Sequence, residues 1–139
     1  MPQHLQTLTV STQGRRLYEI TREVRGWVEG RSSGIGLLTL YCRHTSASLL
    51  ISENAAVEVR RDLEAYFERI APEDPALYAH DDEGPDDMPA HIRAALTATS
   101  LSIPLSGGRP VLGTWQGIYL FEHRRAPHRR EVVLHLLTE

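Results

Sequence analysis

Short apolar runs recur along most of the chain and are separated by turn residues. Runs of this kind, rich in Leu, Ile, Val and Thr, predict β-strands. The predicted strands cover residues 5–10, 17–20, 35–42, 47–52, 101–105, 111–121 and 131–137. Because Gln13 and Gly14 favour a turn, we expect residues 5–10 and 17–20 to form a hairpin.

Three other segments are predicted to be helices: two repeat apolar residues at the spacing of a helix face, and the third carries Pro89 in its expected first turn. In the clearest of them the apolar positions are Val59, Leu63, Phe67 and Ile70. Asn54 is expected to cap this helix, and Thr21 and Asp87 are expected to cap two shorter ones. Few segments alternate a strand with a crossover helix. The pattern therefore predicts an α+β fold with a mostly antiparallel sheet.

Composition narrows the class of protein. A chain of 139 residues fits one domain, residues 1–139, and 41% apolar residues with 24% charged residues are typical of a globular protein. The net charge of -3 argues against a dedicated nucleic-acid binder. No apolar run is long enough for a membrane helix, and no signal peptide is visible, so we expect a cytoplasmic protein without a membrane partner. Cys42 is the only cysteine, which excludes an intrachain disulfide framework.

Polar side chains gather at the junction of two predicted buried strands. Residues 44–48 read HTSAS, and hydroxyl and backbone N–H groups in such a turn are good anion acceptors. A turn whose hydroxyls satisfy their own backbone explains the segment equally well. Further on, Asn54 fits a helix cap, and Glu53 beside it could ligate a cation or accept a proton.

An acidic stretch with two histidines precedes the third predicted helix. Residues 80–91 contain five carboxylates together with His80 and His91. The stretch fits a solvated acidic loop, and it also offers ligands for a divalent metal, either Mg²⁺ or Zn²⁺. His91 lies in the first turn of the helix, where the helix dipole favours a neutral imidazole able to bind a metal.

Two segments near the C-terminus carry further candidate groups. Residues 113–117 read GTWQG inside a predicted strand, where glycine marks a bulge or a close approach, and Trp115 could pack in the core or stack on a ligand. Residues 122–130 place four Arg and two His at a predicted hairpin. Such a turn can be solvated, or its arginines can bind phosphate in bidentate fashion.

Taken together, these motifs resemble the YjbQ family. The resemblance covers residues 35–137 and rests on HTSASLLISENA, DDMPAHIRAAL, SIPLSGG, LGTWQGIYLFEHR and a basic pair before the last strand. It implies an α+β fold with a barrel-like sheet and about three helices, a homotrimer, and a secondary thiamine-phosphate synthase activity. The family's polar signature falls on His44, Thr45, Ser46, Ser48, Glu53, Asn54, Asp87, His91, Gly113, Thr114, Trp115, Gln116, Glu122, Arg129 and Arg130.

The implied reaction joins hydroxymethylpyrimidine diphosphate to thiazole phosphate and releases pyrophosphate. We expect catalytic roles for Glu53, Asp87 and His91 and a divalent metal held by His44, Asp87 and His91. The expected substrate-binding residues are Thr45, Ser46, Ser48, Asn54, Thr114, Trp115, Gln116, Glu122, Arg129 and Arg130. In this hypothesis Arg129 and Arg130 hold diphosphate oxygens, while Trp115 stacks on a flat heterocycle.

Two other classes of function use the same residues. One is a non-catalytic trimer that binds a phosphorylated metabolite or a metal. The other is a metal-dependent hydrolase, which needs a ligand triad with an open coordination position. All three hypotheses require that polar segments far apart in the sequence meet in one cleft.

Overall fold

The backbone alternates strands with three α-helices and one 3₁₀ turn. The computed structural model describes all 139 residues. The elements in order are β1 (Gln3–Gln13), β2 (Arg16–Glu19), α1 (Thr21–Val28), β3 (Gly36–Cys42), β4 (Ala47–Glu53), α2 (Val57–Ile70), η1 (Pro75–Leu77), α3 (Asp87–Leu96), β5 (Ser100–Ser106), β6 (Arg109–Pro110), β7 (Gln116–Glu122) and β8 (Pro127–Thr138).

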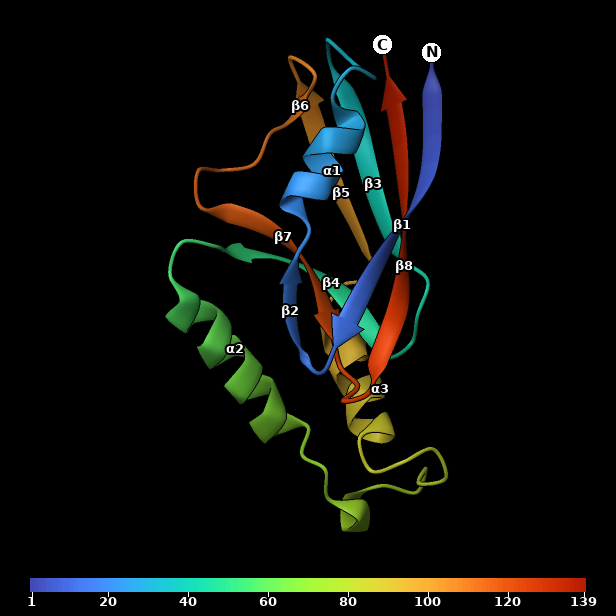
Figure 1. Ribbon diagram of the computed structural model, residues 1–139, viewed down its shortest axis with the longest axis vertical. Helices are drawn as coiled ribbons and strands as arrows, with labels where there is room; N and C mark the ends of the chain where they lie inside the picture. The colour runs from blue at the N-terminus through green and yellow to red at the C-terminus, as the bar shows by residue number, and fades with distance from the viewer.

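The strands form two antiparallel sheets that curl around a shared core as a partial barrel (Figure 1). The larger sheet has the order β1-β8-β3-β5-β6, and the smaller has the order β2-β7-β4. β1 pairs with β8 over its whole length, from Gln3 opposite Leu137 to Gln13 opposite Pro127, so the two chain ends lie together. A bridge between Leu49 of β4 and Ala98 joins the smaller sheet to the chain that enters β5.

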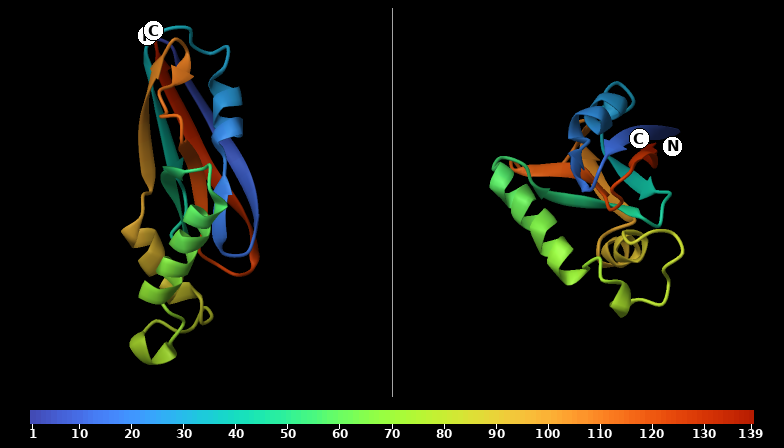
Figure 2. Two further views of the ribbon diagram at one scale, coloured as in Figure 1. Left: turned by 90° about the vertical axis from the view of Figure 1, so that its left-hand side faces the viewer. Right: turned by 60° about the horizontal axis from the view of Figure 1, so that its bottom comes forward.

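The main core lies between the two sheets and α1. Alternate residues of each strand point into it, and α1 adds Val24 and Val28 from one face. A second, smaller apolar cluster lies on the other face of the small sheet, where α2 covers it (Figure 2). There the rings of Phe67 and Phe121 meet edge to face with centroids 5.3 Å apart. None of the three helices is long and apolar enough to cross a membrane.

The predicted α+β class with antiparallel strands and three helices is confirmed, but two local pairings were wrong. β1 and β2 do not form a hairpin, because β1 belongs to the large sheet and β2 to the small one. The segment 122–130 is likewise no hairpin, since β7 and β8 lie in different sheets. In both cases each strand pairs with a strand far away in the sequence instead of with its neighbour, β1 with β8 and β2 with β7. β1 finds eleven partners in β8, whereas β2 has only four residues.

The sequence also misplaced a strand boundary and the helix caps. Residues 111–115 are a loop, in which the backbone N–H of Gly113 donates to Gln116 Oε1 rather than to a neighbouring strand. The N-cap positions fall on Ile20, Ala56 and Asp86 rather than on Thr21, Asn54 and Asp87. No side chain caps α2, and just before it Glu53 Oε2 accepts from the N–H groups of residues 55 and 56 at 3.1 Å.

Candidate functional site: a histidine and carboxylate cluster at the start of α3

Four side chains converge at the N-terminal end of α3. His80 and Glu83 come from the loop that precedes the helix, Asp87 is its first residue, and His91 follows one turn later. Asp87 Oδ2 lies 2.9 Å from His80 Nε2 and 3.2 Å from His91 Nε2, and Glu83 Oε2 lies 3.1 Å from His80 Nε2. The four candidate ligand atoms all lie within 4.8 Å of one another.

Local structure explains why these residues meet. Asp87 and His91 are four residues apart on a helix, so their side chains share one face. The preceding loop turns back at Gly84, whose φ of +99° suits glycine, and this turn brings His80 and Glu83 to the helix start. The loop is also held by Arg124, whose Nη2 donates to the Glu83 carbonyl at 3.0 Å.

The cluster is charged and only partly shielded from water. Asp87 is 4% exposed, whereas the His80 and Glu83 side chains are open to solvent. Burial by itself raises the pKa of Asp87, but His91, His80 and Arg124 together hold that pKa below its usual range. Hydrogen bonds to Glu83 and Asp87 raise the pKa of His80. Asp87 is therefore an anionic group at the base of an open cluster.

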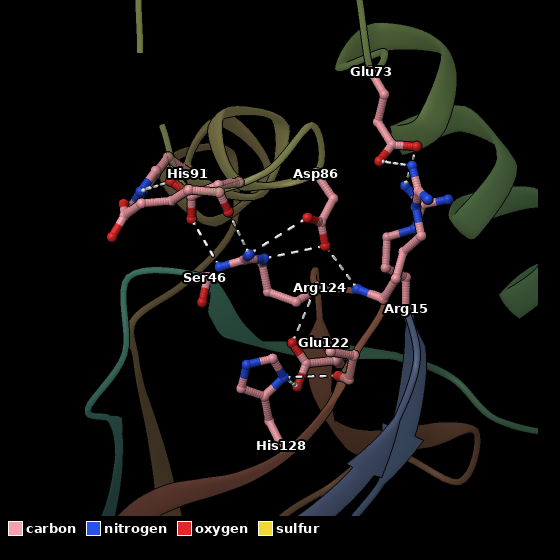
Figure 3. Close-up of polar contacts among 12 residues, drawn as sticks. Arg15, Ser46, Glu73, Asp86, His91, Glu122, Arg124 and His128 are labelled. Atoms are coloured by element: carbon pink, nitrogen blue, oxygen red, sulfur yellow. Dashed lines mark hydrogen bonds and ion pairs between the residues drawn. The ribbon is translucent and has the colours of Figure 1, made fainter. Parts of the chain in front are cut away.

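Arg124 fixes the carboxylates at the helix start (Figure 3). Its Nη1 donates to Asp87 Oδ1 at 2.9 Å, and its Nε donates to Asp86 Oδ2 at 3.1 Å. The Arg125 N–H also donates to Asp86 Oδ2, at 2.9 Å. Because Arg124 takes Oδ1 of Asp87, Oδ2 is left to face the two imidazoles. This is how an outer-shell partner orients a metal ligand.

The donor set fits a divalent transition metal better than Mg²⁺. Two imidazole nitrogens with carboxylate oxygens are a usual set for Zn²⁺, whereas Mg²⁺ prefers oxygen ligands alone. His44, the third residue of the predicted metal set, lies outside this cluster. Its Nε2 accepts the backbone N–H of Glu131 at 2.7 Å.

A pocket of about 580 Å³ is lined in part by His91. One wall is α3, where His91, Ala94 and Ala95 share a face, and the other is the end of β3 with the loop that follows. The polar groups that line it are Tyr41, Arg43, His44, Thr45, His91 and Thr99. Burial, helped by Arg130, lowers the pKa of His44, so this imidazole is neutral and its Nδ1 carries the proton. No carboxylate lines the pocket, which therefore favours an anion.

Several predicted binding residues instead form a buried ion pair. Glu122 is fully buried, and Arg130 donates to both of its carboxylate oxygens. Thr12 Oγ1 donates to Glu122 Oε1 at 2.6 Å, and Arg130 Nη2 donates to Ser46 Oγ at 3.0 Å. Although burial raises the pKa of Glu122, Arg130 and Thr12 hold that pKa below its usual range. These groups join β1, β7, β8 and the loop before β4, and within the chain Glu122 and Arg130 bind one another.

Ser48 also points into the protein. It is 1% exposed, and its Oγ lies 2.8 Å from His123 Nε2. Thr97 Oγ1 lies 2.5 Å from the same oxygen. Burial, with Arg93 nearby, lowers the pKa of His123 to about 3, so this histidine is neutral.

The remaining predicted residues lie at the opposite end of the β4–β7 pair. Ser48 pairs with Phe121 at one end and Glu53 with Gln116 at the other, so these pairs are about 17 Å apart at the rise of a strand. Glu53 holds the turn before α2 through the N–H groups of residues 55 and 56, and Asn54 Nδ2 donates to Glu19 Oε2 at 3.0 Å. Trp115 is 63% exposed in the loop before β7, beside Thr114.

Within one chain the predicted residues therefore do not share a single cleft. The structure brings together Asp87 and His91, and it adds His80, Glu83 and Arg124, which sequence reasoning did not select. The sequence did contain a signal for His80 and Glu83, since both lie in the acidic stretch at residues 80–91. The side chain of Arg129 is exposed near the start of β8 and makes no hydrogen bond or ion pair within the chain.

Known proteins are similar to this chain in sequence and in fold. The family model described as UPF0047 protein YjbQ-like matches residues 6–139. A UPF0047 protein of Synechocystis is 49% identical over 99% of this chain and 93% of its own length. YjbQ of Escherichia coli O157:H7 is 43% identical over 96% of each chain. A crystal structure of a YjbQ/UPF0047 protein from Clostridium acetobutylicum, 30% identical, superposes with a TM-score of 0.85 over 94% of this chain and 98% of that one. The chain belongs to the UPF0047 (YjbQ-like) family.

Proposed function

We propose that His80, Asp87 and His91, with Glu83 as a fourth donor, bind a divalent transition metal. The observation that carries this proposal is the geometry at Asp87, whose Oδ2 faces both imidazoles while Arg124 holds Oδ1. These two histidines and two carboxylates lie outside the main core, and the Asp87 oxygen that faces the imidazoles is not the one that Arg124 holds. The exposed side of the cluster leaves room for a substrate oxygen.

The substrate that we propose is a phosphorylated heterocycle bound in the pocket beside His91. Support comes from the polar lining, in which Arg43, the Thr45 hydroxyl and the His44 Nδ1–H all offer hydrogen to an anion. The apolar part of the pocket, formed by Ala47, Ala94 and Ala95, suits a flat ring. Of the residues that the sequence suggested for phosphate, Thr45 alone lines this pocket.

The reaction that we propose is the thiamine-phosphate synthase reaction that the family resemblance implies. The thiazole nitrogen forms a bond to the methylene carbon of hydroxymethylpyrimidine diphosphate, and the bond from that carbon to the diphosphate oxygen breaks. Pyrophosphate leaves with the electron pair, and no oxidant or reductant is needed. A bound cation would supply charge neutralisation for this leaving group. The chain itself would hold the two substrates so that the thiazole nitrogen faces the methylene carbon, while Arg43 and His44 stabilise negative charge.

The decisive experiment combines metal analysis with a product assay. We expect purified protein to bind Zn²⁺ or Co²⁺ in equimolar amount and to form thiamine phosphate, and we expect His91→Ala to lose both properties. Asp81→Asn, which alters an exposed carboxylate in the same loop outside the cluster, serves as the matched control. Metal binding without product would favour the non-catalytic binder, and release of pyrophosphate without coupling would favour the hydrolase. A protein that binds no divalent metal would overturn the proposal.

We also propose that the chain assembles as a homotrimer, with the outer face of the large sheet as the contact surface. No helix covers this face, and it carries Leu5, Leu37 and Tyr41 in exposed positions. An antiparallel sheet with one solvated face normally shows polar residues there. Light scattering should give three chains per particle, and Leu5→Glu with Leu37→Glu should yield monomers. A monomeric wild-type protein would contradict this assembly.

A further inference from the structure

Two buried side chains and one half-buried side chain form a hydrogen-bonded chain at the C-terminal end of α3. His123 stands at the end of β7, Ser48 lies on β4, and Thr97 is the residue that ends α3. The Ser48 hydroxyl oxygen lies 2.8 Å from His123 Nε2 and 2.5 Å from Thr97 Oγ1. Thr97 Oγ1 also lies 2.9 Å from the carbonyl of Arg93, one turn back in the helix. The chain thus connects the small sheet to the last turn of α3.

A histidine at this position is costly to bury. His123 is 0% exposed, and its Nδ1 has no hydrogen-bond partner. An apolar side chain would avoid the penalty of leaving a buried nitrogen unpaired. The imidazole nevertheless reaches Ser48 at hydrogen-bond distance, which an apolar residue would not do. The imidazole therefore contributes a hydrogen bond that fixes where the Ser48 and Thr97 hydroxyl groups lie.

The neighbouring residue in the sequence holds the other end of the same helix. Arg124 binds Asp86 and Asp87 at the start of α3, while His123 acts through Ser48 on Thr97 at its end. Two consecutive residues thereby anchor a helix about 15 Å long at both ends. His91 lies between the two anchors. A shift of the helix along its axis would move His91 relative to His80, which is carried by a separate loop.

We propose that Ser48, Thr97 and His123 are positioning residues that set the register of α3 and hence the geometry of the His80, Asp87 and His91 site. This inference rests on the proposed metal function. The three residues do not contact the ligand themselves. They hold the C-terminal half of α3 against β4, next to the bridge between Leu49 and Ala98. Outer-shell contacts of this kind change metal affinity even though they lie outside the coordination sphere.

The test compares four variants in Co²⁺ titrations far below the unfolding transition. Thr97→Val removes the hydroxyl with little change of shape, and Ser48→Ala removes the middle of the chain. Thr97→Ser retains the hydroxyl, and Thr9→Val makes the same exchange as the first variant at an exposed position on β1. We expect Thr97→Val and Ser48→Ala to weaken Co²⁺ binding about 10-fold, at the lower end of outer-shell effects. Thr97→Ser and Thr9→Val should bind as the wild type does.

The Kd for Co²⁺ and the denaturation midpoint together distinguish a positioning role from a purely structural one. A purely structural role would lower the denaturation midpoint and leave the Kd for Co²⁺ unchanged, and that result in both Thr97→Val and Ser48→Ala would overturn the inference. If the wild type binds no Co²⁺, the proposed metal function fails, and the positioning role is judged by hydrogen exchange in metal-free protein. Faster exchange of the amides of residues 91–96 in Thr97→Val than in Thr9→Val would then support it, and equal exchange would refute it.

Discussion

Arg124 Nη1 donates to Asp87 Oδ1 at 2.9 Å, so the other oxygen of this carboxylate is directed at two imidazoles. The arginine comes from the segment between the two sheets, and the aspartate begins a helix that lies across the end of them (Figure 1). The orientation of the candidate metal ligand therefore depends on a contact between residues 37 positions apart.

Replacing Asp87 tests the metal site most directly. Asp87→Asn removes the anionic oxygen that faces His80 and His91. Loss of one ligand of a site with few ligands should weaken Zn²⁺ or Co²⁺ binding by at least about 100-fold, more than the loss of an outer-shell partner. Isothermal titration with Zn²⁺ measures the change. Asp81→Asn should bind as the wild type does, and equal affinity of the two variants would disprove the ligand role of Asp87.

Arg124 and Arg125 offer a matched pair for stability. Arg124→Gln leaves the nearly buried Asp86 and Asp87 without their cation, and it should lower the free energy of unfolding by about 3 kcal/mol. Arg125→Gln breaks an ion pair with Glu73 on an exposed side chain, and it should cost much less than Arg124→Gln because water screens this pair. Urea denaturation of both variants gives the comparison. Equal losses would show that Arg124 does not stabilise the two carboxylates.

The buried pair of Glu122 and Arg130 should be essential to the fold. Arg130→Met leaves Glu122 charged and fully buried, and we expect a loss of about 3 to 5 kcal/mol of unfolding free energy. The neighbouring Arg129→Met, on an exposed side chain, should change stability by less than about 0.5 kcal/mol. Thermal or urea unfolding separates the two cases. A small loss in Arg130→Met would argue that water or another cation compensates Glu122.

The low pKa of His123 makes stability depend on pH. Its pKa is about 3 in the folded protein and about 6.5 when the chain is unfolded, so the unfolded state binds the proton first as the pH falls. Stability from this group is complete above pH 6.5 and is lost below it, by about 1.4 kcal/mol per pH unit between pH 6 and 4. Urea unfolding at pH 7.5, 6 and 5 measures the slope.

Two variants show whether His123 is the source of that slope. His123→Gln removes the titrating group and should flatten the decline over this range of pH. His128→Gln removes a histidine that is partly open to solvent and should leave the slope unchanged. A decline of the same steepness in His123→Gln and the wild type would assign the pH dependence to other groups.

The sequence by itself determined the elements and the class of fold. Apolar periodicity located β3, β4, β5, β8, α1 and α2, because burial of alternate or every third to fourth residue is a local pattern, and Pro89 in a first turn located α3. The acidic stretch at residues 80–91 also contains the four residues that we propose as metal ligands, but only the structure showed that Asp87 and His91 share one helix face.

Only the tertiary structure decided which of the polar groups meet. It separated β1 from β2, buried Glu122, Arg130 and Ser48 in the interior, and placed Trp115 at the far end of β4 and β7. A sequence pattern does not distinguish a polar residue that binds a ligand from one that pairs inside the protein. That distinction depends on which distant partner, such as Arg130 for Glu122, the folded backbone brings within hydrogen-bond distance.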